Sequence, residues 1–388
     1  MNNQRMRLLL CSLVILISLP LAGCWSSKEI ENLGFIVGTS LDLETAATDH
    51  NRNLLTITNQ FLTSETVGAG TKEGKTHQKA YKNISETGDA ALPTLRNMIL
   101  RIDKRAFAEH SKVLVIGENL ARTLNLQQTL DFFIREQEMR PSGLILIARD
   151  RASLTLESKN PIDIPAFQLL EMTQGHDRTT KILPPMTLTK IQGKLNSGAS
   201  FLLQSVSSIK GEIKFTGAAV IKGKTNKLGG FLNEEELEGL TWISGKGKGG
   251  LVRGFDEETG LPLVYEILSM KSVIKSNVEG DRISFDVLIE SEGRIAEHWD
   301  VSEKEFENGY LKRAEQASEK EVERLIKNVL NKIQHKYQAD VSGFGNRLRI
   351  EHPRVWEKVK RDWDQTFSEV PIHCEVKLTI KDYGTSDH

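Results

Sequence analysis

A single apolar segment at the N-terminus constrains the organisation of this chain more than any other feature. Residues 8–21 are almost entirely apolar, two arginines precede them, and small residues follow up to Cys24. A short basic region, a brief apolar region and a small-residue end are typical of a secretory signal. The segment is too short for a spanning helix, which needs ~20 apolar residues, and Pro20 would break it near its end. We therefore expect residues 1–23 to be a signal peptide.

The end of this segment, Leu21-Ala22-Gly23-Cys24, resembles the lipobox of bacterial lipoproteins. The resemblance implies cleavage before Cys24, attachment of a lipid to its thiol, and acylation of the new amine by a fatty acid such as palmitate. Two or three acyl chains bind a membrane stably, whereas one binds only marginally, so this group would hold the whole chain. Cys24 is therefore the predicted lipidation site. The alternative is an ordinary signal peptide with a cysteine there by chance.

The remaining composition is that of a globular protein, with 39% hydrophobic and 27% charged residues among 388. Removing residues 1–23, which hold two arginines and no acidic residue, lowers the formal net charge from −1 to −3. A protein that binds nucleic acid by neutralising phosphates is usually strongly basic, so we expect no nucleic-acid partner. Neither half of the chain offers a polybasic region for anionic lipid, and the anchor itself is expected to provide the membrane attachment.

Three cysteines leave no intramolecular disulfide. Cys11 leaves with the signal peptide and Cys24 carries the lipid, so Cys374 is the remaining thiol. It alternates with Val376 and Leu378 in a strand pattern, which favours a buried small hydrophobic residue. The alternative for a lone cysteine in an exported protein is a bond to another chain.

The N-terminal part, residues 24–210, is predicted to be an α/β region. Apolar runs indicate strands and periodic segments indicate helices: strands at 33–38, 54–61, 113–116 and 144–148, and helices at 89–100 and 126–138. This strand–helix–strand order indicates a mixed sheet with helices packed on it. The proline-punctuated stretch at about 150–210 is a candidate second subdomain.

Residues 211–388 are predicted to form a C-terminal α+β domain. Asn233 followed by three glutamates is a typical helix N-terminus. The other expected elements are strands at 212–222, 251–254, 263–275 and 283–290, and a long amphipathic helix at 302–337. Hairpins followed by long helices indicate an antiparallel sheet with helices on one face. The expected fold class is multi-domain α+β with mixed sheets.

The sequence offers no convincing catalytic or cofactor motif. Gly245, Gly247 and Gly250 formally match a dinucleotide-binding fingerprint, but a helix pattern precedes them and a strand pattern follows, the reverse of what that site needs. A flexible turn explains them better. HExxH, CxxC, GxSxG and phosphate-loop motifs are absent, and the nine histidines are scattered without a helical i, i+4 pair. We therefore predict no catalytic residue, metal ligand or cofactor-binding residue.

One aromatic stripe leaves two interpretations open. Trp356, Val359, Trp363 and Phe367 recur at helical spacing within residues 353–367. A stripe of this kind usually faces a hydrophobic core, and we favour that interpretation. The alternative is a partner-binding face, because Trp and Arg are enriched among the residues that dominate interfaces.

Several separated motifs together resemble the Ger(x)C family, the lipoprotein C subunits of bacterial spore germinant receptors. Near the N-terminus they are Cys24-Trp25, Glu29-Ile30, Leu33, Val37, Gly38 and Asp42. Further along they are residues 220–222, 227–232 and 236–242, then Glu351-His352-Pro353 with Trp356, Trp363 and Phe367 of the aromatic stripe, and Gly384. Ser26 departs from the acidic residue that usually follows the Cys-Trp pair. The resemblance covers nearly the whole chain after Cys24.

The resemblance implies a role in assembly. Such C subunits act with integral-membrane A and B subunits at the inner membrane of the dormant spore, on its extracytoplasmic face. They are required for nutrient-triggered germination, and the resemblance implies a non-enzymatic protein without a cofactor. One alternative is the solute-binding lipoprotein of an importer, which predicts two similar lobes with a hinge and a polar cleft. Another is a surface lipoprotein hydrolase, which predicts clustered acids or a Ser/His pair in a pocket.

Overall fold

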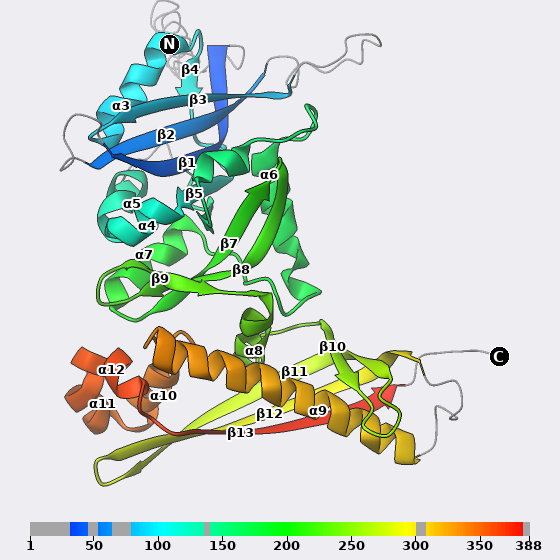
Figure 1. Ribbon diagram of the computed structural model, residues 1–388. Coiled ribbons are helices and arrows are strands. Elements are labelled where there is room, and N and C mark those ends of the chain that lie inside the picture. Colours follow the sequence, from blue (N-terminus) through cyan, green and yellow to red (C-terminus); the bar gives the residue numbers. More distant parts are fainter. Residues whose placement is uncertain (1–31, 46–52, 64–78, 136–139, 300–307, 383–388) are drawn as a thin grey trace, which may run out of the picture.

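The chain folds into two stacked lobes (Figure 1). The computed structural model describes residues 32–45, 53–63, 79–135, 140–299 and 308–382. The predicted signal peptide and Cys24 lie outside these residues. Within them, no helix combines the length and the apolar character needed to cross a membrane. Each lobe is built on its own sheet, and the fold class is the expected α+β with mixed sheets and helices packed on them.

In the described residues, nine strands form the first sheet. They are β1 (Leu33–Thr45), β2 (Asn53–Leu62), β3 (Tyr81–Gly88), β4 (Arg105–Phe107), β5 (Val113–Gly117), β6 (Leu144–Ala148), β7 (Phe201–Ile209), β8 (Glu212–Lys222) and β9 (Lys227–Leu232). Their order is β3-β2-β1-β5-β6-β7-β8-β9, and β4 pairs with the start of β1. The four strands predicted before residue 150 are therefore confirmed.

Both faces of the first sheet are covered. The helices are α3 (Ala91–Met98), α4 (Glu118–Thr123), α5 (Leu126–Arg135), α6 (Pro165–Met172) and α7 (Leu188–Ser197). All residues of β5 and β6 are buried, as continuous apolar runs in the middle of a covered sheet should be. Along β5, Leu114 and Ile116 enter one hydrophobic cluster, while Val113 and Val115 enter another. The strand alternation thus divides the core of this lobe into two layers.

The first sheet continues beyond residue 210. β7 pairs in parallel with β6, so the stretch at 150–210 contributes a strand to the sheet of the preceding region. A tight turn with positive φ at Lys210 and Gly211 then joins β7 to its antiparallel partner β8. The expected boundary at 210/211 falls in this turn, and the sheet ends only at Leu232.

The second lobe contains four strands in its described part, together with most of the long helices. Its elements are α8 (Glu234–Ser244), β10 (Leu251–Phe255), β11 (Pro262–Glu279), β12 (Arg282–His298), α9 (Asn308–Asn331), α10 (Phe344–Glu351), α11 (Pro353–Val359), α12 (Trp363–Phe367) and β13 (Ile372–Asp382). The predicted cap of α8 is confirmed: Asn233 and Glu236 form a reciprocal capping box. The glycines at 245–250 form the turn between α8 and β10.

The second sheet is only partly antiparallel. β10, β11 and β12 pair antiparallel as predicted, but β13 joins β12 in parallel, so the expectation of an antiparallel sheet is wrong at this strand. The reason is the connection. Residues 308–367 form a helical crossover between β12 and β13, and such a crossover returns the chain in the same direction. Alternation in the sequence indicates a strand but not its direction.

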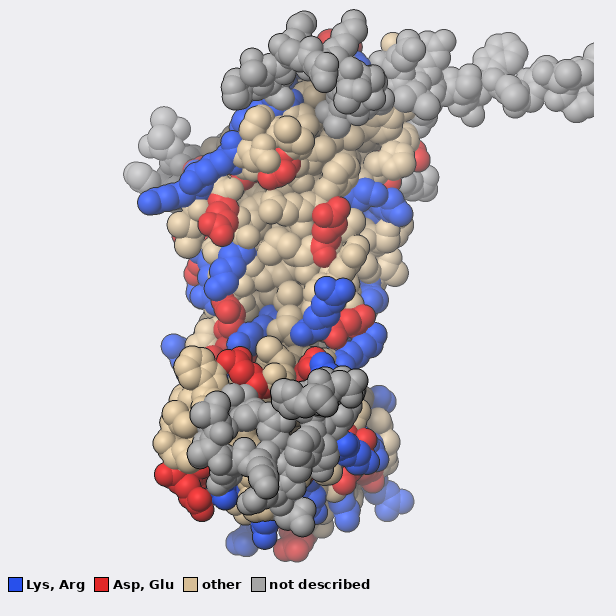
Figure 2. Space-filling model, turned by 90° about the vertical axis from the view of Figure 1, so that its right-hand side faces the viewer, with Lys and Arg blue, Asp and Glu red and all other residues tan. Residues whose placement is uncertain are grey.

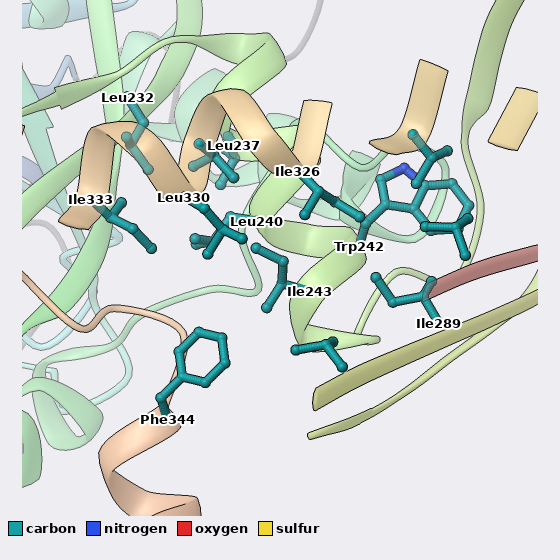
Figure 3. Packing of buried hydrophobic residues seen from close by; sticks show 14 of the residues in the cluster. Leu232, Leu237, Leu240, Trp242, Ile243, Ile289, Ile326, Leu330, Ile333 and Phe344 are labelled. Carbon is teal, nitrogen blue, oxygen red and sulfur yellow. The ribbon is translucent and has the colours of Figure 1, made fainter. Parts of the chain in front are cut away.

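One hydrophobic core spans the junction of the lobes. Trp242 of α8 is fully buried in it, among residues of α9 and β12 (Figure 3). The same cluster includes Val220 and Leu232 of the first sheet. A Cβ on Gly239 would lie 2.4 Å from the carbonyl oxygen of Leu325, so glycine permits the close approach of α8 and α9. The two lobes are therefore packed against each other around α8.

Candidate functional site: the groove between the lobes

A groove of about 1200 Å³ lies between the two lobes. On the first lobe it is lined by residues 182–186, the end of α7 and the start of β7. On the second lobe it is lined by the loop before α10 and by parts of α11 and α12. These segments are more than a hundred residues apart in the sequence. No pattern in the sequence predicts the groove.

Positive side chains predominate around the groove. Of the lining residues that the structure describes, seven are cationic and three are acidic: Lys194, Lys222, Lys224, Lys246, Arg349, Lys360 and Arg361, against Asp340, Asp362 and Asp364. On the face of the molecule that Figure 2 shows, Lys and Arg are interspersed with Asp and Glu. A concave surface with an excess of one sign attracts ligands of the other.

Asp340 forms the floor of the groove on the second lobe. Its carboxylate accepts hydrogen bonds from the backbone N–H groups of residues 342–345 at 2.6–3.2 Å and from the indole Nε1 of Trp363 at 2.8 Å. Gly343 has a φ of 92°, and a Cβ on Gly345 would lie 2.4 Å from Trp363 Nε1. Burial raises the pKa of the Asp340 carboxyl, while the donors around it act to lower it.

The aromatic stripe is mainly a core feature. Trp363 and Phe367 are buried against Phe285 and Phe344, so the favoured interpretation is confirmed for them. Trp356 is half-buried, with its ring 5.5 Å from that of Trp363, and lines the groove. The stripe is not one continuous helix as expected. It is interrupted by a 3₁₀ turn at 360–362, which orients Trp363 toward Asp340.

Polar contacts connect the two walls of the groove. Lys222 of β8 donates to the carbonyl oxygens of Tyr337 and Gln338 at 2.6 and 2.5 Å, and burial lowers its pKa. Ser200 donates to Asp364 at 2.7 Å. The hydroxyl of Tyr337 accepts from the N–H of Phe231 and donates to its carbonyl, as a neighbouring strand would at the edge strand β9. These bonds fix the lobes relative to each other.

Two polar side chains of the groove, Ser200 and His176, are hydrogen-bonded within the protein. Ser200 bonds an aspartate, and the groove histidine His176 bonds the carbonyl of Thr173, so these two do not form the Ser/His pair that a hydrolase would use. Within the described ranges no three His, Cys, Asp or Glu residues are grouped so that they could hold a metal ion. The lobes also differ from each other, unlike the similar lobes expected of an importer's solute-binding protein.

Cys374 lies on β13 and packs at the margin of the main core. His373 points to the exposed opposite face, as the alternation predicts. Burial raises the pKa of the Cys374 thiol to about 11.

The reactivity of Cys374 can be measured in a chain with Cys24→Ala. We predict that its thiol reacts with an aromatic disulfide reagent at pH 7 about a hundredfold more slowly in the native chain than in the chain unfolded in urea. The reason is that the thiolate is the reacting form, and the raised pKa lowers its population. Equal rates would show that the thiol is accessible.

The residues that build the groove were missed for a common reason. Lys222 and Tyr337 act through contacts that are distant in sequence, and so does Asp340 in its hydrogen bond with Trp363. The signal present in the sequence is the Asp340-x-x-Gly343-x-Gly345 spacing, in which an acid is followed by two glycines. Such a spacing is typical of a loop that folds its N–H groups around a carboxylate. Cys24, the predicted lipidation site, lies outside the described residues, and its role stays a prediction.

The chain is similar to known proteins over nearly its whole length. Residues 26–208 match the family "Spore germination protein N-terminal domain", and residues 216–384 match "Spore germination B3/GerAC like, C-terminal". Spore germination protein YndF of Bacillus subtilis (strain 168) is 42% identical, over 96% of this chain and 96% of that protein. Spore germination protein B3 of the same organism is 32% identical, over 96% and 97%.

A solved structure supports the same relationship. The crystal structure of the GerBC protein aligns with a TM-score of 0.63 and 28% sequence identity, covering 89% of this chain and 97% of that one. The likeness includes both lobes.

Proposed function

This chain belongs to the spore germination B3/GerAC-like family, and from that membership we propose that it is the lipid-anchored, non-enzymatic C subunit of a spore germinant receptor. The observation that carries the proposal is the match of both family domains in order, beginning two residues after the lipobox cysteine Cys24. In this proposal the subunit lies on the extracytoplasmic face of the inner spore membrane. Its partners are the integral-membrane A and B subunits.

The proposed lipid anchor promotes assembly by raising the local concentration of this chain beside its partners. A lipid at Cys24 confines the chain to two dimensions, which raises its effective concentration beside partners in the same membrane. Modest contacts between folded surfaces then suffice for a stable complex. The charge of the groove indicates one such contact: an acidic segment of a receptor subunit, because the lining carries a cationic excess.

Co-purification tests the assembly. We expect an affinity-tagged chain, extracted from spore membranes in mild detergent, to bring A- and B-type membrane subunits with it in comparable amounts by mass spectrometry. Co-purification of an importer permease in their place would favour the solute-binding alternative. Recovery of the chain without any membrane protein would contradict the proposal.

Charge reversal tests the groove. Lys194 and Arg361 stand on opposite walls, and both side chains are exposed. Lys194→Glu with Arg361→Glu is expected to lower the recovered partner about fivefold or more, because two rim charges change from attractive to repulsive. The matched control is Lys271→Glu with Lys275→Glu, on the exposed face of β11, which should leave recovery unchanged. An equal loss of recovered partner in the groove variant and in the control variant would show that the groove is not part of the interface.

A further inference from the structure

An unusual apolar patch lies on α3 and the 3₁₀ turn that follows it. The exposed fractions of Leu92, Ile99 and Leu100 are 42%, 59% and 87%. Residues 92, 96, 99 and 100 share one side of the helix by their spacing, whereas Thr94 and Met98 on the other side are buried. Isolated exposed apolar residues are normal, but a group of large ones on one helix face indicates a contact surface.

Basic side chains outnumber acidic ones in this segment, since residues 91–105 contain Arg96, Arg101, Lys104 and Arg105 against Asp103. Arg96, Arg101 and Arg105 are exposed within the same short segment. Arg101 reaches Glu86 of β3 at 3.4 Å and also donates to the carbonyl of Ser85, so the turn is held to the sheet in a defined position. Apolar side chains flanked by cations are the composition of elements that lie at the surface of an anionic bilayer.

The patch lies where the chain enters the first lobe. β4 pairs in parallel with β1 in a register that sets Arg105 beside Leu33. Cys24 precedes Leu33 by nine residues, which at full extension span ~30 Å, so a lipid on Cys24 stays within that distance. Figure 1 shows α3 and β4 at the end of the molecule farthest from the second sheet. The anchor and the patch therefore belong to the same end.

We propose that the surface formed by Leu92, Arg96, Ile99, Leu100 and Arg101 is a second, non-covalent membrane contact that inserts at the interface of an anionic phospholipid bilayer. This inference rests on the proposed anchoring at Cys24. A lipid at Cys24 together with the patch would fix the orientation of the chain on the membrane, whereas the lipid on a flexible tether alone would not. The first lobe then stands on the membrane, with the second lobe directed away from it. The nearly balanced charge of each half of the chain does not reveal this local group of arginines.

Depth-dependent quenching tests the contact. The full chain, lipidated and with Cys374→Ala, is reconstituted in phosphatidylcholine vesicles containing about a third phosphatidylglycerol. An environment-sensitive fluorophore is attached at Leu100→Cys, or at Ile350→Cys as the control. Ile350 is 57% exposed and lies on α10 in the second lobe. Nitroxide-labelled lipid is expected to quench the Leu100→Cys probe about threefold more than the control, since only the former would lie at the bilayer interface.

Charge and anchor are then varied separately. Arg96→Glu with Arg101→Glu should reduce the quenching at Leu100→Cys to the control level, and so should vesicles without phosphatidylglycerol. The mass of the N-terminal peptide reports acylation of Cys24 independently. An acylated chain whose two probes are quenched equally would overturn the membrane contact while leaving the anchor intact. If Cys24 carries no lipid, the anchor itself fails, and the peptide mass distinguishes this result from an acylated chain whose two probes are quenched equally.

Discussion

Asp340→Ala is expected to lower the unfolding free energy of the second lobe by about 4 kcal/mol, because it leaves several buried donors without an acceptor. The carboxylate accepts four backbone N–H bonds from residues 342–345 and one from the indole of Trp363. Each buried donor left unsatisfied costs roughly 1–3 kcal/mol, and water entering from the groove offsets part of the sum. Urea unfolding followed by tryptophan fluorescence measures the loss.

Two variants separate this effect from a simple change of charge. Asp340→Asn keeps one acceptor oxygen, but its amide nitrogen replaces the other oxygen and cannot accept from the donors there. We therefore expect it to lose about half as much unfolding free energy as Asp340→Ala. Asp362→Ala removes an exposed aspartate 3.4 Å from Lys224 on the same rim, and should change the unfolding free energy by less than about 0.5 kcal/mol. A midpoint for Asp340→Ala equal to that of Asp362→Ala would show that the loop does not depend on this carboxylate.

The features predicted correctly from the sequence are those that nearby residues determine. Asn233 caps α8 because its partner Glu236 lies three positions away. β5 and β6 are evident as apolar runs because strands covered on both faces need no polar alternation. Trp363 and Phe367 are core residues because periodicity identifies the buried face of a helix. In each case the determining interaction lies within one turn or one strand of the residue itself.

The features that were missed depend on contacts distant in sequence. The direction of β13 follows from the helical crossover, and the alternation of its residues would be the same in either direction. The break at 360–362 lets Trp363 reach Asp340, which lies 23 positions earlier. Lys222, which lines the groove, donates to the carbonyls of Tyr337 and Gln338, more than a hundred positions later. Local pattern carries no information about these pairs.

The two proposed contacts, with the membrane at the patch and with a receptor subunit at the groove, lie at different heights along the molecule. The patch lies on α3 and the turn after it, at the end of the first lobe farthest from the second sheet, and the groove lies at the junction with the second lobe. If the first lobe stands on the bilayer, its own thickness separates the groove from the lipid. An acidic segment bound there would have to extend above the membrane surface, so we expect the partner contact in an extracytoplasmic loop or domain of a receptor subunit.

Cys24→Ala is expected to release the chain from the membrane and to abolish its contribution to nutrient-triggered germination. The substitution removes the thiol that would carry lipid. It also leaves small residues on both sides of Gly23, a pattern that ordinary signal peptidase cleaves, so an uncleaved apolar segment should not retain the chain. The membrane-bound fraction, measured by immunoblot of spore fractions, should fall to less than about a tenth, because a patch of a few apolar residues binds only marginally without the anchor.

Cys374→Ala is the matched control for this experiment. It removes the other thiol of the mature chain, which lies half-buried on β13, and should leave both the membrane fraction and the germination response unchanged. The N-terminal mass of Cys24→Ala confirms whether the signal was removed. A soluble, cleaved Cys24→Ala chain that restored full germination would contradict the anchoring hypothesis, because assembly would then need no confinement to two dimensions. A cleaved chain that remained fully on the membrane would instead assign the retention to the patch and to the receptor partners.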